Sequence, residues 1–268
     1  MIYLKSVMVR NWQDRENGEF PFTVPVIQAL EEIVFSSPVT FLVGENGSGK
    51  STLLESLACA VESITVGSES VKTDKSLTSI RRLAWYYRLA WSKRTHKGFF
   101  LRAEDFFGYA KSLRKTREEL EQDLREVDRE YEGRSEYAAD LARMSYRGEL
   151  AAMKKRYGED LDHYSHGESF LTLFQSRFVP DGLYLLDEPE AALSPSRQLT
   201  FLSALKQMAD QNSQFIIATH SPIILAFPDA VILSFDDGKI REVKYEELEH
   251  VKLTRDFLNS PHSFLRHL

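Results

Sequence analysis

Runs of apolar residues along the chain predict a buried sheet. Residues 39–43, 182–186 and 215–218 are almost wholly apolar, which is typical of parallel strands that are covered on both faces. Residues 231–235 and 240–243 flank the turn sequence Asp-Asp-Gly-Lys, and this pattern predicts a β-hairpin. The expected core is therefore a sheet that is mostly parallel, with an antiparallel edge.

Further strands are expected outside this core. Residues 2–12 alternate between apolar and polar positions, and residues 99–102 form a short apolar run. The stretch 20–26 is apolar, contains two prolines and is expected to be extended. We expect the segments 2–12 and 20–26 to form antiparallel strands beside the parallel sheet.

Apolar positions at helical spacing predict helices between these strands. The apolar face of 51–63 follows the first buried strand, and Ser-Pro-Ser at 194–196 marks a helix start with proline in its first turn. From 110 to 161 the chain has no proline and many charged residues, and its apolar stripes predict a helical hairpin turning near Gly133. These stripes are too short for a long coiled coil. The tail, 245–268, is expected to form short amphipathic helices.

The composition indicates a soluble globular protein. The chain has 268 residues, of which 43% are hydrophobic and 28% are charged, so it can bury a sizeable core. It has no run of eighteen apolar residues and its first residues do not have the pattern of a signal peptide, so we expect it in the cytoplasm. The single cysteine, Cys59, excludes an internal disulfide and is expected to be a packing residue.

One basic segment departs from the net charge of −6. Between 72 and 97, Lys and Arg residues are interleaved with four aromatic residues, and only Asp74 opposes them. Such a mixture suits a surface that binds a phosphate backbone and stacks bases. The alternative, which we favour, is an amphipathic helix whose aromatic residues belong to the core and whose basic face is solvated. The basic positions that would test DNA binding are Arg81, Arg82 and Arg88.

A glycine-rich segment follows the first apolar run. It reads Gly-Glu-Asn-Gly-Ser-Gly-Lys-Ser-Thr between a predicted strand and a predicted helix, which is the arrangement that binds a nucleoside triphosphate, and we expect ATP. The glycines let successive N–H groups converge on phosphate oxygens. Lys50 is expected to contact the β and γ phosphates, and the Ser51 hydroxyl to enter the shell of Mg²⁺. The expected nucleotide-binding residues are Gly44, Glu45, Asn46, Gly47, Ser48, Gly49, Lys50, Ser51 and Thr52.

Charged residues follow the next two buried strands. Asp187 and Glu188 end the second strand, at the edge where open α/β sheets bind ligands. Asp187 is expected to hold Mg²⁺, and Glu188 to polarise a water molecule for attack on the γ phosphate. His220 ends the third strand, so it should emerge at the same edge and hydrogen-bond the γ phosphate. Together with Lys50, Glu188 and His220 are the expected catalytic residues.

These motifs resemble the nucleotide-binding domain of ABC-type ATPases, in the soluble branch that contains the SMC, RecF and break-repair ATPases. The resemblance identifies 44–52 as the Walker A loop, 183–188 as the Walker B strand with its glutamate, and His220 as the switch histidine. Tyr-Ser-His-Gly-Glu-Ser at 164–169 is similar to the signature loop, which normally reads Leu-Ser-Gly-Gly-Gln/Glu, and Ala-Ala-Leu-Ser at 191–194 is similar to the D-loop. The motifs occur in the order of the family.

The resemblance implies an α/β P-loop NTPase fold with a mostly parallel sheet, antiparallel strands and a helical insertion. It implies one ABC-type ATPase domain over 1–268, in which an insertion at about 104–180 carries the signature loop. In this family the signature loop binds the ATP held by a second subunit, so Ser165 and Gly167 are expected to complete the site in an ATP-dependent homodimer. His166 replaces the usual glycine and adds a side chain close to the expected γ phosphate.

Two features of the family have no clear counterpart. The glutamine loop should follow the strand 99–102, where Glu104 is expected either to substitute near the metal or to cap a helix. The aromatic residue that stacks on adenine has Trp12 as its candidate, because Val-Arg-Asn-Trp at 9–12 is similar to the first strand of the SMC-like branch.

We therefore expect a cytoplasmic ATPase that uses ATP and Mg²⁺, closes as a homodimer on ATP, and acts on DNA or on a separate effector protein. The glutamate in the signature, the Thr-His-Ser-Pro sequence around His220 and the position of the helical insertion favour this hypothesis. The alternative is the ATPase subunit of an ABC transporter, which docks onto separate membrane proteins. The missing glutamine loop and the altered signature weigh against it, so a membrane partner is not expected.

Overall fold

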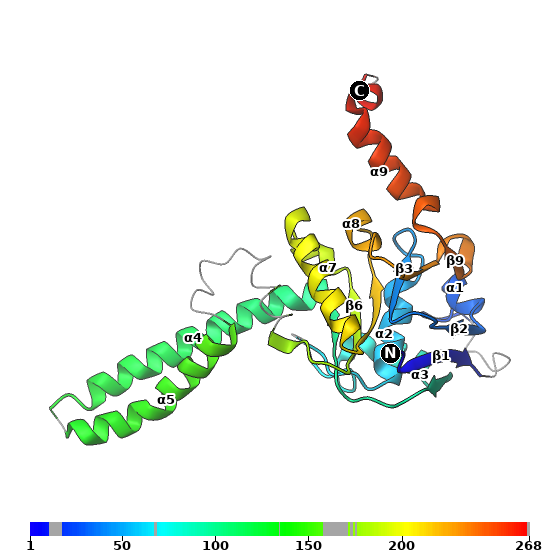
Figure 1. Cartoon of the computed structure of the whole chain (residues 1–268). Coiled ribbons are helices and arrows are strands. Elements are labelled where there is room, and N and C mark those ends of the chain that lie inside the picture. The colour runs from blue at the N-terminus through cyan, green and yellow to red at the C-terminus, as the bar shows by residue number, and fades with distance from the viewer. Residues whose placement is uncertain are drawn as a thin grey trace.

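The computed structural model describes residues 1–10, 18–66, 69–133, 135–157, 171, 174 and 176–266. The body of the molecule is built from two sheets and the helices that pack on them, and two helical segments project from it (Figure 1). One projection is the pair α4 (Ala103–Glu130) and α5 (Glu136–Tyr157), and the other is formed by α9 (Glu249–Asn259) and α10 (Pro261–Leu265).

Six strands form the larger sheet in the order β5-β6-β7-β3-β8-β9. Adjacent strands are parallel except β9, which is antiparallel to β8. Every residue of β3 and β7 is buried, and this burial on both faces explains their apolar sequences. The predicted buried strands and the predicted hairpin are therefore confirmed. In spatial order the strands are β5 (Phe100–Arg102), β6 (Leu183–Asp187), β7 (Gln214–Ala218), β3 (Val39–Val43), β8 (Val231–Ser234) and β9 (Arg241–Val243).

The smaller sheet consists of β2 (Glu32–Val34), β1 (Leu4–Val9) and β4 (Tyr87–Trp91), all antiparallel. The buried side chain of Gln214 joins it to the larger sheet. Its Oε1 atom accepts hydrogen bonds from the backbone N–H groups of Tyr3 and Leu4, both at 2.8 Å, and its Nε2 atom donates to the Leu4 carbonyl at 2.9 Å. The strand predicted near the N-terminus is confirmed as β1.

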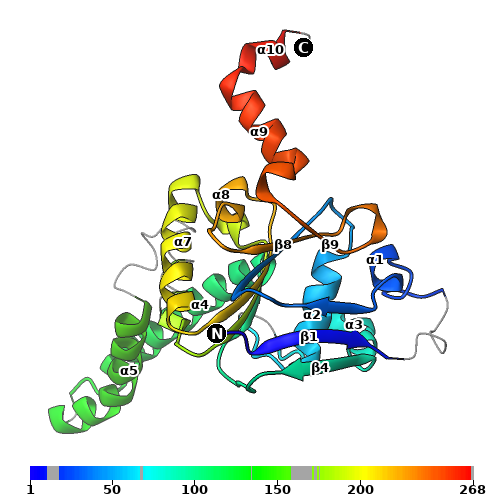
Figure 2. The same ribbon diagram turned by 45° about the vertical axis from the view of Figure 1, so that its right-hand side comes forward.

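Helices cover both faces of the larger sheet, as Figure 2 shows. On one face, α1 (Pro25–Gln28), α2 (Lys50–Ala60) and α3 (Thr78–Ala84) share a core with the smaller sheet. On the other face, α7 (Pro195–Asp210) packs Phe201 and Leu205 against the strands. The predicted helix starts near 51 and 194 are confirmed. The other short helices in the described part of the chain are α8 (Pro222–Leu225), η2 (Lys75–Leu77), η3 (Pro189–Ala192), η4 (Asp236–Gly238) and η5 (Tyr245–Glu247).

The helices α4 and α5 form an antiparallel arm that extends from the body (Figures 1 and 2). Gly133 has a φ of 78° in the turn between them, a conformation that favours glycine. Arg143 of α5 donates to Asp128 of α4 at 2.6 Å, and Leu120 and Ala139 are buried. The helical hairpin predicted to turn near Gly133 is present, and its first helix begins directly after β5.

Two predictions from the sequence are wrong. The stretch 20–26 is not a strand, because its end forms the start of α1, with Pro25 in the first helical turn. The basic aromatic segment is not one helix either, since α3 ends at Ala84 and β4 begins at Tyr87. Along β4, the side chains of Tyr87, Leu89 and Trp91 pack on the core, and the side chains between them, Arg88 and Ala90, are exposed. This alternation from one residue to the next is that of a strand.

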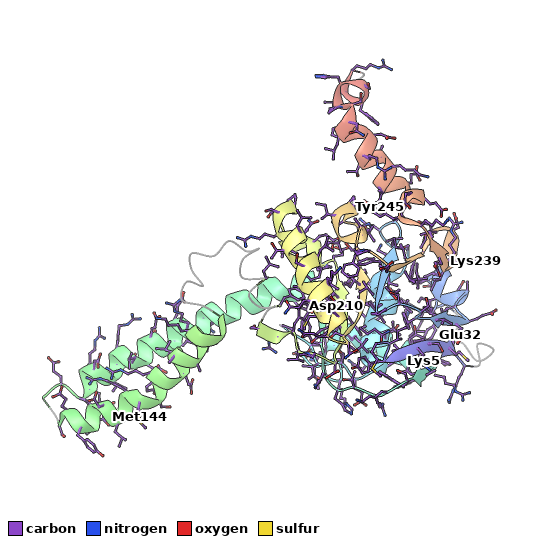
Figure 3. The ribbon with its side chains drawn as sticks, viewed as in Figure 1. Lys5, Glu32, Met144, Asp210, Lys239 and Tyr245 are labelled. Atoms are coloured by element: carbon purple, nitrogen blue, oxygen red, sulfur yellow. The ribbon has the colours of Figure 1, made fainter. Side chains whose placement is uncertain are left out.

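The C-terminal helices α9 and α10 stand away from the body. Near their root, Leu248 and Val251 are buried, and the Tyr245 hydroxyl donates to the Pro222 carbonyl at 3.0 Å. Figure 3 shows Tyr245 at the base of this projection and the side chains of α9 beyond it. Leu253 and Leu258 of α9 are exposed. Among the described residues, no helix is both long enough and apolar enough to cross a membrane.

Candidate nucleotide-binding site

The loop between β3 and α2 has the backbone that the glycine pattern predicts. Gly44, Gly47 and Gly49 have φ angles of 145°, 81° and 102°, which side chains with a Cβ rarely adopt. A Cβ on Gly49 would lie 2.6 Å from a methyl carbon of Val26, so the loop packs closely on α1. The N–H groups in the first turn of α2 have no partners within the helix, and this end of the helix favours an anion.

Lys50 is the first residue of α2 and is only 5% exposed. Its Nζ atom donates to the carbonyls of Gly44 at 2.8 Å and Glu45 at 2.9 Å, so the side chain folds back along the loop. Burial lowers the pKa of Lys50, while the nearby carboxylates of Glu188 and Asp187 act in the opposite direction. The ammonium group therefore lies between the loop and the carboxylates, where it could contact the phosphates of a nucleoside triphosphate bound to the loop.

The other predicted loop residues lie at the same place. Glu45, Asn46 and Ser48 line a cleft in front of the loop. The Ser48 hydroxyl is buried and has no hydrogen-bond partner among the described residues. Thr52 lies in the first turn of α2 and is partly buried.

Asp187 and Ser51 are in contact, as expected for two metal ligands. The Ser51 hydroxyl donates a hydrogen bond to Asp187. Burial raises the pKa of Asp187 to about 7, although the hydrogen bond from Ser51 lowers it. The Oδ1 atom of Asp187 is buried and has no partner in the described part of the chain. Carboxylate and hydroxyl oxygens are the ligands that Mg²⁺ prefers, so these two residues fit that ion. No group of three or more His, Cys, Asp or Glu residues that could hold a metal is found among the described residues, and phosphate and water would complete the shell.

Glu188 and His220 lie side by side at the end of β6 and β7. Glu188 adopts a left-handed backbone conformation with a φ of 49°, and its N–H donates to the Ala218 carbonyl at 2.9 Å. The distance between His220 Nε2 and Glu188 Oε1 is 3.8 Å. His220 Nε2 is buried without a hydrogen-bond partner among the described residues. Burial lowers the pKa of His220, so the imidazole is neutral near pH 7.

Sequence reasoning missed a carboxylate that positions His220. Glu190 lies in η3, and its Oε1 atom accepts a hydrogen bond from the His220 backbone N–H at 2.6 Å. Burial raises the pKa of Glu190. Beside it, the Ser221 hydroxyl donates to Gln198 of α7, and Gln198 donates to the Leu193 carbonyl at 3.1 Å. This network connects the segment that resembles the D-loop to the histidine loop.

The cleft in front of the loop has a volume of about 860 Å³, which is large enough for a nucleotide. One wall is the loop, and another comes from the β8–β9 hairpin and the start of α9. Asp236 joins the two walls, because its Oδ1 atom accepts from the Glu45 backbone N–H at 3.1 Å and its Oδ2 atom accepts from the Ser234 hydroxyl at 2.8 Å. His220 and His250 also line the cleft. Sequence reasoning read Asp236 only as part of a turn and assigned no role to His250.

A buried ion-pair cluster adjoins the carboxylate edge. Arg102 ends β5 and pairs in register with Asp187 at the end of β6. Its guanidinium contacts Glu55 at 3.2 Å, Asp74 at 3.1 Å and Asp105 at 2.7 Å. Asp105 belongs to the first turn of α4, so this cluster fixes the root of the arm beside the site. The sequence gives no local signal for it, because Glu55 and Asp74 are distant along the chain.

Several predicted site residues cannot be placed. Ser165, Gly167 and the rest of 164–169 lie outside the described residues, as does Trp12. Glu104 lies in the first turn of α4, and its side chain is outside the described part.

Two models of AAA-domain families match this chain. A family model described as “AAA domain, putative AbiEii toxin, Type IV TA system” matches residues 69–226, which is more than half of the chain. A second model, described as “AAA domain”, matches residues 25–81 and so includes the glycine-rich loop.

Individual relatives share less than 30% of their residues with this chain over the matched regions. An uncharacterized ABC transporter ATP-binding protein from Haemophilus influenzae is 27% identical over 205 residues, covering 75% of this chain and 71% of that protein. The L-cystine transport system ATP-binding protein TcyN from Escherichia coli is 23% identical over 221 residues, covering 81% of each. Among solved structures, the Smc head domain of Pyrococcus furiosus bound to the C-terminal domain of ScpA is 14% identical, with a TM-score of 0.45, covering 96% of this chain and 100% of that one.

Proposed function

From the premise that this chain belongs to the AAA-domain family matched over residues 69–226, we propose that it binds and hydrolyses ATP as a molecular switch. The chain is an ABC-type nucleotide-binding domain. The observation that carries the proposal is the convergence of Lys50, the Ser51–Asp187 pair, Glu188 and His220 at one edge of the parallel sheet.

Each of these residues has a proposed role. The loop 44–52 binds the phosphates through its N–H groups, and Lys50 neutralises charge on the β and γ phosphates. Ser51 and Asp187 hold Mg²⁺, which when bound neutralises phosphate charge. Glu188 orients a water molecule and accepts its proton, while the neutral His220 donates a hydrogen bond to the γ phosphate.

We propose that two copies of the chain close around two ATP molecules. The side chains of Glu188 and His220 are 47% and 37% exposed, and hydrolysis at such an open edge gains from a cover that excludes bulk water. In this proposal the cover is the loop containing Ser165 and Gly167 of the partner subunit. The whole chain then acts as one ATPase domain over 1–268, with the insertion at about 104–180 supplying the loop.

We further propose that the homodimer works in the cytoplasm and passes its state to DNA or to a separate effector protein. The arm formed by α4 and α5 supports this proposal, because the Arg102 cluster fixes its root beside the nucleotide edge. A shift in the position of Asp187 could therefore be passed through the neighbouring strand β5 to α4, the helix that follows β5 and extends from the body (Figure 1).

The second candidate is the ATPase subunit of a transporter. The names of the two relatives from Haemophilus influenzae and Escherichia coli favour it. Native copurification from the source cells separates the two candidates, because a transporter subunit would be recovered with integral membrane proteins. The switch hypothesis expects soluble complexes instead, with an ATPase rate that responds to DNA or to the copurified effector.

The direct test of the proposed function combines an ATPase assay with size-exclusion chromatography. Wild-type protein with ATP and Mg²⁺ is expected to release phosphate, and under conditions that block hydrolysis it is expected to elute as a dimer. Protein that binds no nucleotide would contradict the whole proposal. Protein that hydrolyses ATP but stays monomeric at high concentration with bound ATP would contradict the dimer alone.

A further inference from the structure

Two histidines from different elements line the nucleotide cleft. His220 follows β7, and His250 is the second residue of α9. Both line the cleft of about 860 Å³ whose other wall is the glycine-rich loop. They lie close enough for the charge of His250 to lower the pKa of His220. The mechanism proposed above uses His220 and gives His250 no role.

The Nε2 atoms of both histidines are buried and have no hydrogen-bond partner among the described residues. A buried polar atom without a partner costs free energy comparable to a lost hydrogen bond. Both histidines line the cleft, so a rotation of the ring that turns Nε2 toward the cleft would let a bound ligand supply the missing partner. His220 already has that ligand in the proposed function, which is the γ phosphate. The same argument applies to His250.

The surroundings of His250 indicate which kind of ligand its side chain would bind. Burial lowers the pKa of His250, although Asp236 acts in the opposite direction, so the imidazole is neutral near pH 7 and has one N–H to donate. Asp236 also accepts a hydrogen bond from the Glu45 backbone N–H at 3.1 Å, so the carboxylate that acts on His250 also touches the phosphate loop. A metal is the weaker choice, because no metal-binding group of three ligands is found among the described residues.

We propose that His250 is a second nucleotide-contacting histidine, whose Nε2 atom hydrogen-bonds the phosphate chain of the triphosphate held on residues 44–52. This inference rests on the proposed ATP-binding function. It makes α9 part of the site, since His250 lies in its first turn and Leu253, one turn later, also lines the cleft. The projecting helices α9 and α10 are thereby coupled to whether a triphosphate is bound.

The test measures nucleotide binding by the full chain in isothermal titration calorimetry with Mg²⁺. The probes are ADP and the non-hydrolysable ATP analogue AMP-PNP. The variants are His250→Ala, His250→Gln, which keeps a side-chain N–H donor, and His262→Ala, an exposed histidine of α10 that serves as the matched control. Lys50→Ala tests the phosphate loop itself.

We expect His250→Ala to weaken AMP-PNP binding about tenfold, the size of one lost hydrogen bond to a charged group. His250→Gln should recover part of the loss, and His262→Ala should bind like the wild type. A structural role alone would lower the melting temperature of the nucleotide-free His250→Ala variant, whereas our inference expects that temperature to be unchanged or higher. His250→Ala that folds and binds both nucleotides like the wild type would overturn the inference and leave the proposed function intact. Wild type that binds neither nucleotide would overturn both.

Discussion

The imidazole Nε2 atom of His220 lies 3.8 Å from the carboxylate Oε1 atom of Glu188. The two residues follow adjacent parallel strands, and the hydrogen bond from the Glu188 N–H to the Ala218 carbonyl fixes their relative positions. Because burial lowers the pKa of His220, the pair is a neutral donor beside a carboxylate. In the proposed function, a water molecule on the carboxylate and a phosphate on the imidazole would therefore lie side by side in front of this pair.

Replacing Glu188 with Gln should slow ATP turnover by about 10²- to 10⁴-fold, because the amide cannot accept the proton of the attacking water. ATP binding should remain, so the variant should accumulate as an ATP-bound dimer. Phosphate release and size-exclusion chromatography check the two parts. Glu242→Gln, at an exposed position of β9, is the matched control and should turn over like the wild type. Full turnover by Glu188→Gln would remove Glu188 from its proposed role.

Replacing Lys50 with Ala should weaken ATP binding by about 10- to 100-fold, because one hydrogen bond to a charged group is lost at the phosphates. The melting temperature should change little, since the Nζ atom hydrogen-bonds only two loop carbonyls in the described structure and burial disfavours its charge despite the nearby carboxylates. Calorimetric titration measures the affinity. Lys206→Ala, at an exposed position of α7, is the control. Equal affinities for both variants would show that the nucleotide binds elsewhere.

Replacing Arg102 with Ala should destabilise the protein by about 3–5 kcal/mol, because buried carboxylates lose their counter-charge. The affected groups are Glu55, Asp74 and Asp105, whose side chains are 17%, 13% and 12% exposed. Arg143→Ala on the arm is the control and should cost much less, since its partners Asp128 and Asp140 are more than half exposed. Chemical denaturation compares the two variants, and equal losses would contradict the importance of the cluster.

The rate at which the Cys59 thiol reacts with a labelling reagent should differ between the folded and the unfolded protein. Burial raises the pKa of Cys59 to about 11, so at pH 9 the folded protein should react with a thiol reagent about a hundredfold more slowly than the denatured protein. Between pH 9 and 11 the unfolded chain loses this proton while the folded chain keeps it, so stability should fall as pH rises. Stopped-flow labelling with and without denaturant measures the ratio. Equal rates would show that the thiol is not protected.

Replacing Arg88 with Glu should lower affinity for DNA and reduce the salt dependence of binding by about one phosphate contact, with nucleotide affinity unchanged. The structure selects Arg88 because it is exposed on β4, whereas Arg81 binds the carbonyls of Val71 and Asp74. Arg255→Glu on α9 is the control. Fluorescence anisotropy at several salt concentrations measures binding, and wild-type protein without salt-sensitive DNA binding would remove the hypothesis.

The elements that could be predicted from the sequence are those whose signal is local. β3 and β7 are buried on both faces and follow continuous apolar runs, and the loop after β3 needs three glycines in a short span. β4 was mistaken for a helix because its alternating residues follow directly on α3, where apolar positions have helical spacing. There the strand was selected by pairing with β1, a contact that the local pattern does not contain.

The positioning residues could not be predicted, because their roles depend on long-range contacts. Glu190 holds a backbone N–H that is 30 residues away, and Asp236 holds one that is 191 residues away. His250 lies in the amphipathic C-terminal tail, about thirty residues after His220, the last motif residue. The proposed contribution of Ser165 and Gly167 stays a prediction, as do the other functional assignments of the site residues.

The arm gives small movements at the sheet edge a large reach. The helix α4 has 28 residues, so at 1.5 Å per residue it is about 42 Å long. If α4 pivots as a rigid rod about its first turn beside Arg102, a rotation of about 10° displaces its far end by about 7 Å. A small rotation at the sheet edge would thereby become a displacement wide enough to open or close a contact between proteins.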